Sequence, residues 1–304
     1  VGDGLRAPKE IDAGGLLVMP GGVDTHCHLD QVEPGMGYGA ESFFSGSQSA
    51  LRGGTTSAIS FVSQFKGEPI REVLAETLRR GRRSIIDYSF HQIITDPSDE
   101  VIAEIPAIVA SGIRSLKVFL TYDGAHLDDR QYLKVLAAAR REGAMTVVHC
   151  ENYEAIGWLT EQLIAAGLTA PKYHAWSRPK VVEREATYRA IALAELVDTP
   201  IQVFHVSCAE VAEEIARAGS GLGELRARNN DLGTLGARQL AGSAALADLI
   251  VLDVAGNKIA AGGLRALGGS PHLSRLAGLD VRHNGLPADA ERQGGGSDGY
   301  RRHV

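Results

Sequence analysis

The sequence predicts an α/β fold: an incomplete TIM-type (β/α) barrel with six clear βα units and remnants of a small β-sandwich. Along residues 21–218, apolar runs of β-forming residues alternate with amphipathic runs of helical period. This alternation is typical of a parallel sheet with crossover helices. No glycine-rich phosphate motif follows the first run, which disfavours a dinucleotide-binding fold. Six consecutive units also exceed a small flavodoxin-like sheet, so a barrel is the better prediction.

The elements follow one another in regular order. The predicted strands occupy residues 23–27, 56–62, 85–92, 115–120, 144–149 and 201–205. The predicted helices occupy residues 41–52, 68–82, 98–111, 129–142, 152–166, 182–197 and 207–218. Pro69 suits the first turn of the second helix, where no N–H is needed. Ser98 followed by Asp99 and Glu100 is typical of a helix start.

Three segments divide the chain. We expect a partial β-sandwich segment at 1–20, a (β/α) barrel at 21–218, and a Gly-rich region at 219–304 with one sandwich-like strand at 247–253. No Phe, Trp or Tyr occurs between Val206 and Gly299. A glycine-rich, aromatic-poor segment loses much conformational entropy for little apolar burial. The sequence therefore predicts that 219–304 is weakly ordered or irregular.

Composition narrows the function classes. The chain is 44% hydrophobic and 22% charged, as in soluble globular proteins. A formal net charge of −6 gives no basic footprint, so we expect no nucleic-acid partner. No apolar run approaches the roughly 18 residues of a membrane span, and the first residues lack the apolar core of a signal peptide. Three cysteines are too few for a disulfide scaffold, so the sequence predicts a cytoplasmic protein.

Two histidines end the first predicted strand. Residues two apart on a strand point to the same face, so His26 and His28 should aim together while Cys27 turns away. Two imidazoles on one face make half of a divalent metal site. The pair by itself also fits an ordinary surface or core position, so the metal interpretation depends on further ligands.

Further candidate ligands lie on later strands. Lys117 lies on the fourth strand, His149 ends the fifth and His205 ends the sixth. Each alone also fits a structural role, but barrel enzymes keep their chemistry at the carboxyl ends of strands. Burial between apolar neighbours should lower the pKa of Lys117 and free its amine. A free amine can react with carbon dioxide to give a carbamate whose two oxygens can bridge two metal ions.

In this order on successive strands, the residues resemble the cyclic-amidase branch of the amidohydrolase superfamily, in particular dihydropyrimidinases and D-hydantoinases. The resemblance extends from about residue 11 to 218 and leaves the C-terminal part outside the family pattern. Its supporting stretches are Thr95–Glu100, Lys117–Gly124, His149-Cys150-Glu151-Asn152, Ser177-Arg178-Pro179 and Glu183–Arg189.

The resemblance implies a barrel with two Zn²⁺ ions beside a small β-sandwich. It implies hydrolysis of a small cyclic amide, a dihydropyrimidine or hydantoin ring, by a metal-bridging hydroxide, and assembly into a homotetramer. By this resemblance, His26 and His28 hold the more buried zinc, His149 and His205 hold the second, and carboxylated Lys117 bridges them.

Tyr122 matches the tyrosine that hydrogen-bonds the substrate and the developing oxyanion in that family. The family also has a strand-eight Asp as general base, and no clear match follows residue 218. Asp298 resembles it only superficially, because no strand precedes it. Three interpretations stay open: a dihydropyrimidinase or hydantoinase, an allantoinase or dihydroorotase type of cyclic amidase, and a catalytically impaired or non-catalytic relative that acts through assembly.

Overall fold

The computed structural model describes residues 11–33, 37–218 and 223–284. The chain divides into two compact units, one comprising Val1–Phe61 and Glu76–Phe90, the other Val62–Ala75 and His91–Val304. None of the helices within the described ranges is long and apolar enough to cross a bilayer.

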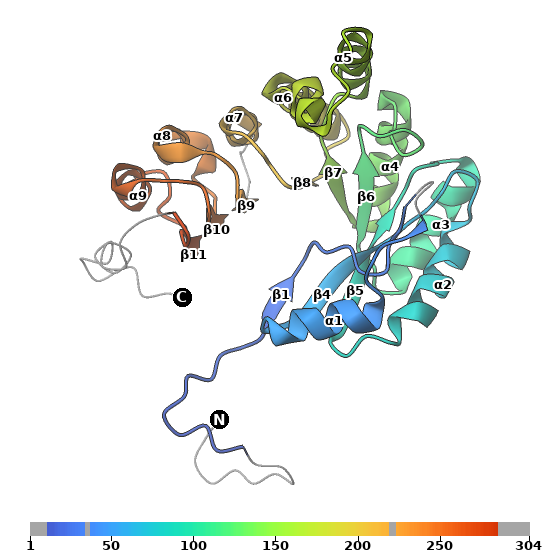
Figure 1. Ribbon diagram of the computed structural model, residues 1–304, viewed down its shortest axis with the longest axis horizontal. Helices are drawn as coiled ribbons and strands as arrows, with labels where there is room; N and C mark the ends of the chain where they lie inside the picture. The colour runs from blue at the N-terminus through green and yellow to red at the C-terminus, as the bar shows by residue number, and fades with distance from the viewer. Residues whose placement is uncertain (1–10, 34–36, 219–222, 285–304) are drawn as a thin grey trace. The chain divides into compact units, whose positions relative to one another are not determined.

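Six strands form one sheet in the order β1-β4-β5-β6-β7-β8 (Figure 1). The pairs β1–β4, β5–β6, β6–β7 and β7–β8 are parallel. The predicted α/β class is therefore confirmed, although the first and last strands are shorter than expected. The strands are β1 (Gly22–Asp24), β4 (Thr55–Val62), β5 (Asp87–Ile93), β6 (Ser115–Phe119), β7 (Met145–His149) and β8 (Ile201–Val203).

The first unit contains α1 (Phe43–Arg52) and a hairpin of β2 (Val32–Glu33) and β3 (Gly37–Tyr38). The side chain of Ser42 accepts the Ser45 N–H and forms a capping box that starts α1. Phe43 is 1% exposed, and its ring meets the Phe90 ring edge-on at 5.8 Å. The cap and this aromatic contact together fix the first turn of α1.

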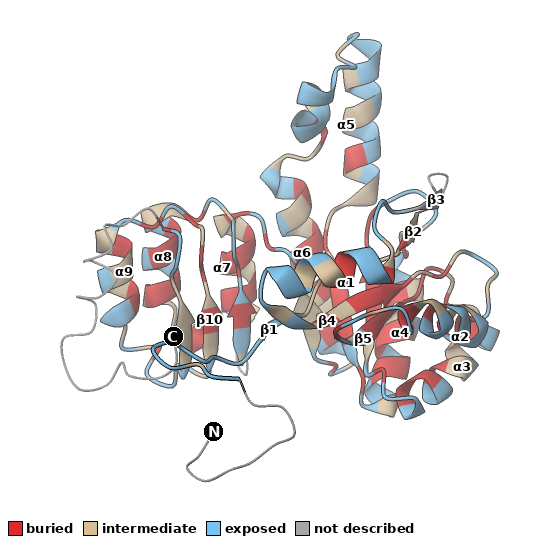
Figure 2. Cartoon of the chain, turned by 60° about the horizontal axis from the view of Figure 1, so that its bottom comes forward, coloured by how far each residue is buried: buried red, intermediate tan, exposed pale blue. Residues whose placement is uncertain are grey.

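Three helices of the barrel-like part begin at side-chain caps. Ser98, Asp128 and Asn152 each accept a backbone N–H at the start of α3, α4 and α5. Figure 2 shows α3 and α4 with buried residues on one face and exposed residues on the other. The elements are α2 (Ile70–Gly81), α3 (Asp99–Ala110), α4 (Asp129–Glu142), α5 (Tyr153–Ala165), the 3-10 helix η1 (Pro171–Ser177), α6 (Lys180–Leu196) and α7 (Ala209–Ala218).

The predicted sandwich segment at 1–20 lies partly outside the described residues. Residues 11–21 contain a turn and no strand. Leu17 is 91% exposed and Met19 is 73% exposed. A strand needs a neighbour for its backbone N–H and C=O groups, and within the described ranges this run pairs with none.

Ordered repeats occupy residues 223–284, the described part of the C-terminal region that the sequence predicts to be irregular. Leu225, Leu252 and Leu279 recur every 27 residues. Each lies in the middle of a short strand, and the three strands pair in parallel in the order β11-β10-β9. Within residues 247–253, Val251–Asp253 form β10, which pairs in parallel with both neighbouring strands. The elements are β9 (Glu224–Arg226), α8 (Gly233–Gly242), the 3-10 helix η2 (Ala244–Leu246), β10 (Val251–Asp253), α9 (Ala261–Gly268) and β11 (Gly278–Asp280).

An asparagine follows each of these leucines by five residues, at Asn230, Asn257 and Asn284. This spacing matches the pattern L-x-x-L-x-L-x-x-N-x-L of leucine-rich repeats, which stack strand–helix units side by side. Stacking buries a continuous core without aromatic side chains, because each unit covers the apolar face of the next. The low aromatic content that predicted disorder is thus compatible with an ordered solenoid.

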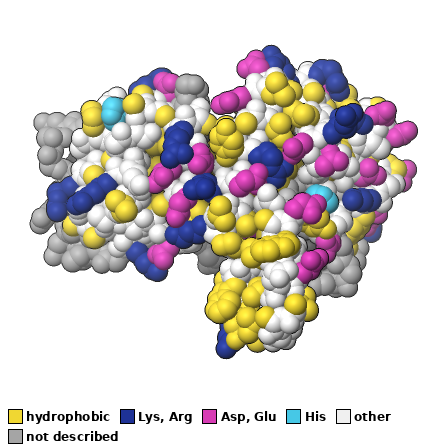
Figure 3. Space-filling view, turned by 90° about the horizontal axis from the view of Figure 1, so that it is seen from above, with side chains coloured by type: hydrophobic (Ala, Val, Ile, Leu, Met, Phe, Trp, Pro, Cys, Tyr) yellow, Lys and Arg dark blue, Asp and Glu magenta, His cyan; other side chains and the backbone are white. Residues whose placement is uncertain are grey.

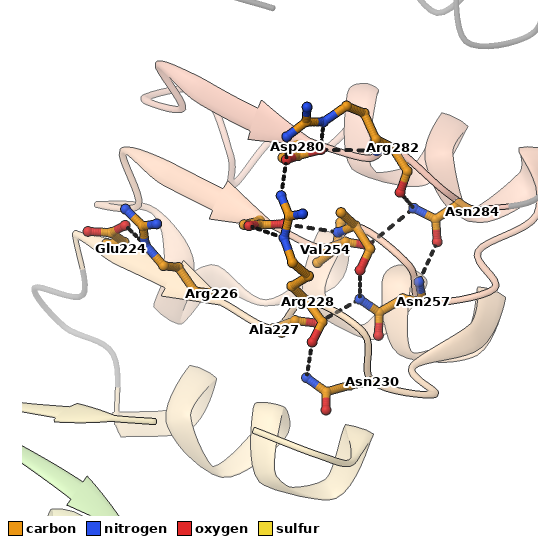
Figure 4. A network of polar contacts seen from close by, with 12 residues as sticks. Glu224, Arg226, Ala227, Arg228, Asn230, Val254, Asn257, Asp280, Arg282 and Asn284 are labelled. Carbon is orange, nitrogen blue, oxygen red and sulfur yellow. Dashed lines mark hydrogen bonds and ion pairs between the residues drawn. The ribbon is translucent and has the colours of Figure 1, made fainter. Parts of the chain in front are cut away.

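Asn257 and Asn284 tie adjacent repeats together (Figure 4). Asn257 Nδ2 donates to the carbonyl oxygens of Ala227 (2.6 Å) and Ala255 (3.0 Å). Asn284 Nδ2 donates to the Val254 carbonyl at 3.1 Å, and Asn284 Oδ1 accepts the backbone N–H of Asn257 at 2.9 Å. Both asparagines are buried, so these bonds satisfy backbone groups that water cannot reach.

The helix α7 closes one side of the repeat core. Val206, Val211 and Ile215 belong to the same buried cluster as Leu225 and Leu252. The solenoid core therefore begins directly after β8, within the barrel-like part of the chain.

Charged side chains cover the surface in mixed pairs. Figure 3 shows acidic and basic groups interspersed on the face seen from above. Exposed pairs such as Arg189–Asp129, at 2.6 Å, are worth about 0–1 kcal/mol each. These charges favour solubility more than they stabilise the fold.

Candidate metal centre

Lys117 lies at the centre of β6 and is 1% exposed. Its Nζ atom lies 4.8 Å from the centroid of the Phe119 ring and 4.7 Å from that of Phe204. Burial lowers the pKa of the Lys117 amine to about 7, against an opposing effect of Cys150. Near neutral pH, a large fraction of this amine is therefore unprotonated and nucleophilic.

His149 and His205 lie at neighbouring strand ends. His149 is the last residue of β7, and His205 follows β8 by two residues. The Phe204 N–H donates to the Val148 carbonyl at 3.0 Å, which extends the pairing of the two strands. As a result, the imidazole centroids of His149 and His205 lie 4.5 Å apart. Burial lowers the pKa of His149, which favours the neutral imidazole that binds metals.

Tyr122 lies three residues beyond the end of β6, in a turn. Its φ of 74° is rare for a residue with a side chain and costs on the order of 1–3 kcal/mol. The His126 N–H donates to the Tyr122 carbonyl at 3.0 Å and closes the turn. The Tyr122 ring meets the His149 ring at 4.8 Å, and the residue is 41% exposed. The turn therefore holds a phenol beside His149 with access to solvent.

Glu151 and Arg178 also reach this cluster. Both lie in stretches that support the family resemblance, but the sequence predicts no role for either residue. Glu151 Oε2 lies 2.7 Å from His149 Nε2. Arg178 Nη1 lies 3.4 Å from the same carboxylate oxygen, and Arg178 Cζ lies 5.7 Å from the centroid of the Tyr122 ring. Burial opposes ionisation of Glu151, but the bond from His149 and the charge of Arg178 lower its pKa.

His26 and His28 lie together in the first unit. The sequence predicts that a strand over 23–27 ends in these histidines, but β1 ends at Asp24 and both histidines lie in the loop that follows. Asp24 Oδ1 accepts the His26 N–H at 3.0 Å, which turns the chain out of the strand. The two imidazole centroids are nevertheless 5.3 Å apart, and the His28 ring stacks on Phe61 at 4.7 Å.

The residues of the second unit fit part of a metal site. Within the described residues, no group of three or more His, Cys, Asp or Glu side chains could hold a metal ion. The second unit does offer two adjacent imidazoles and a buried amine that can become an oxygen ligand, a donor set that suits zinc. Asp298 lies outside the described residues.

Comparisons with known proteins give one consistent picture. No family model matches the chain. A D-hydantoinase from Ralstonia pickettii is 43% identical over 216 residues, which cover 70% of this chain and 47% of the relative. A D-hydantoinase from Rhizobium radiobacter is 42% identical over 214 residues, with the same two coverages.

Solved structures agree with the curated relatives. The crystal structure of dihydropyrimidinase from Brevibacillus agri NCHU1002 superposes with a TM-score of 0.67 at 32% identity, covering 90% of this chain and 60% of that one. The chain spans about half the length of the curated relatives it matches. Over about 70% of its length, the chain is therefore similar to D-hydantoinases in sequence and to a dihydropyrimidinase in fold.

Proposed function

We propose that this chain is a metal-dependent cyclic amidohydrolase that opens hydantoin or dihydropyrimidine rings, and that it carries the metal-binding part of the active site. In this reaction, water adds its oxygen to a ring carbonyl carbon. The ring C–N bond breaks, and the leaving nitrogen takes a proton. The observation that carries the proposal is the cluster of Lys117, His149, His205 and Tyr122 in one unit of a chain related to D-hydantoinases.

The cofactor that fits these donors is a pair of zinc ions. His149 and His205 would hold one, His26 and His28 the other, and carboxylated Lys117 would serve both. When bound, the metal ions supply polarisation of a carbonyl and activation of water near neutral pH.

Lys117 and Tyr122 contribute chemistry of their own. The unprotonated Lys117 amine attacks the carbon of carbon dioxide and loses a proton, which leaves an N-carboxylate. The low dielectric around its 1% exposed side chain favours the neutral amine needed for that step. The Tyr122 hydroxyl donates a hydrogen bond to the substrate carbonyl oxygen as negative charge develops there.

Metal analysis and a ring-opening assay test the proposal together. Protein reconstituted with zinc and bicarbonate should bind close to two zinc ions and should hydrolyse hydantoin or dihydrouracil. Lys117→Ala should lose the two-metal stoichiometry, whereas Lys134→Ala, an exposed lysine on α4, should keep it. Less than half an equivalent of metal in reconstituted protein would refute the proposal.

A second candidate is a metal-binding relative that acts through assembly without catalysis. It is favoured by the short parallel strands and helices that follow β8, because they form a sheet and a core of their own. Protein that is loaded with metal but inert toward both rings would support it. A homotetramer and a cytoplasmic location stay predictions, and light scattering of the purified protein tests the first.

A further inference from the structure

Glu151 stands in a fixed position relative to His149. It follows His149 by two residues and directly precedes Asn152, the N-cap of α5. Asn152 Oδ1 accepts the Ala155 N–H at 2.9 Å, and the Asn152 N–H donates to the Val182 carbonyl at 3.1 Å. The backbone on the C-terminal side of Glu151 is therefore held by both α5 and the start of α6.

The contact between the two side chains selects one state of the imidazole. Glu151 Oε2 lies 2.7 Å from His149 Nε2, and the two side chains are only 16% and 12% exposed. An ionised carboxylate can only accept, so Nε2 must donate. In the neutral ring the lone pair then lies on Nδ1, which is the nitrogen left for a metal ion.

Arg178 connects this carboxylate to Tyr122. Its Nη1 lies 3.4 Å from Glu151 Oε2 and 3.5 Å from Oε1, and its guanidinium lies over the Tyr122 ring. Arg178 Nε also contacts His174 Nε2 at 3.1 Å, which anchors the arginine to η1. One arginine thus touches both the partner of a candidate ligand and the candidate oxyanion donor.

We propose that Glu151 and Arg178 are positioning residues: Glu151 fixes the tautomer and orientation of His149 for metal binding through Nδ1, and Arg178 braces Glu151 and the Tyr122 ring. The inference rests on the proposed function in that His149 is taken as a metal ligand. Carboxylates that orient ligating histidines typically change metal affinity by about 10- to 100-fold when removed.

Zinc competition against a chromophoric chelator measures the effect directly. We expect Glu151→Ala to weaken zinc binding by about 10- to 100-fold. Glu151→Gln should retain part of the affinity, because its amide oxygen still accepts from Nε2. Arg178→Ala should lose less than Glu151→Ala, because the carboxylate remains. The matched control is Glu154→Gln, because Glu154 is an exposed acid in the first turn of α5; this variant should leave zinc affinity unchanged.

Nitrogen-15 NMR of metal-free protein provides a second measurement that does not depend on zinc. Wild type should show His149 protonated on Nε2, and Glu151→Ala should shift the ring toward a mixture of tautomers. Unchanged affinity and an unchanged tautomer in Glu151→Ala would overturn the inference. An equal loss of affinity in Glu154→Gln would overturn it as well. Wild-type protein that binds no zinc refutes the proposed function instead, and the tautomer measurement still decides the role of Glu151.

Discussion

Replacing Lys117 with Met removes a titrating group from the sheet and should change how stability depends on pH. The amine has a pKa of about 7 in the folded protein and 10.5 without its surroundings. Between these values the unfolded chain binds more protons than the folded one, so the free energy of unfolding rises with pH. Below pH 7 the Lys117 amine is protonated in both the folded and the unfolded chain, so the free-energy cost of burying its charge is constant. Above pH 10.5 the amine is neutral in both states, and this cost vanishes.

The expected size of this effect follows from the width of the window. Each pH unit inside it is worth up to about 1.4 kcal/mol, so wild type should gain about 2 kcal/mol between pH 7 and pH 9 relative to Lys117→Met. Methionine keeps the length and apolar packing of the side chain but has no proton to release. Groups that do not interact with Lys117 titrate alike in both proteins, so their contributions cancel in the difference.

Urea unfolding followed by circular dichroism measures that difference. Both proteins should be studied in metal-free buffer purged of carbon dioxide, so that the amine stays uncarboxylated. The two stability curves should converge as pH rises from 7 to 9. Parallel curves over this range would refute the conclusion that burial holds the Lys117 amine near neutrality.

Two pairs of substitutions, each measured by urea unfolding, test the hydrogen bonds between the C-terminal repeats and the left-handed end of α4. Asn257→Ala leaves buried backbone carbonyls without donors and should destabilise the protein by about 1–3 kcal/mol, whereas Asn230→Ala removes one 3.2 Å bond at an exposed site and should cost less than about 1 kcal/mol. Equal losses would contradict the role of the asparagine bonds between repeats. Gly143 ends α4 with a φ of 64°, so Gly143→Ala should destabilise by about 1 kcal/mol, whereas Gly157→Ala inside α5 has open space and should stabilise by about 0.5–1 kcal/mol. A gain at Gly143 would refute the left-handed cap.

Local patterns in the sequence were sufficient to predict the barrel-like part. Runs of β-forming residues, helix caps such as Ser98 and the spacing of buried positions act within a few residues, so strands and helices fall close to their predicted ranges. The first and last strands of the sheet are shorter than predicted, and the first shows why. The Asp24 side chain accepts the His26 N–H and ends β1 early. A side chain here competes with the backbone hydrogen bonds of the sheet, and the pattern of apolar and polar residues does not show this.

The C-terminal region shows what composition can hide. Its glycine content and lack of aromatic residues predicted irregular structure, yet the recurrence of Leu225, Leu252 and Leu279 at 27 residues was already present in the sequence. A repeat of 27 residues is much longer than the period of a helix or a strand, so a search for those short periods does not detect it. The order comes from stacking between repeats, since no single repeat buries its own apolar face.

The sequence by itself determined which residues could serve a metal site. The order of His26, His28, Lys117, His149 and His205 along alternating strand and helix patterns is visible in the sequence, and it places His149 and His205 at the carboxyl ends of neighbouring parallel strands. Only the tertiary structure decided that Lys117 is buried against Phe119 and Phe204, and that Glu151 and Arg178 meet at His149. The reason is physical: pKa values and hydrogen bonds depend on what surrounds a group, and here Phe204 and Arg178 come from parts of the chain far from Lys117 and His149.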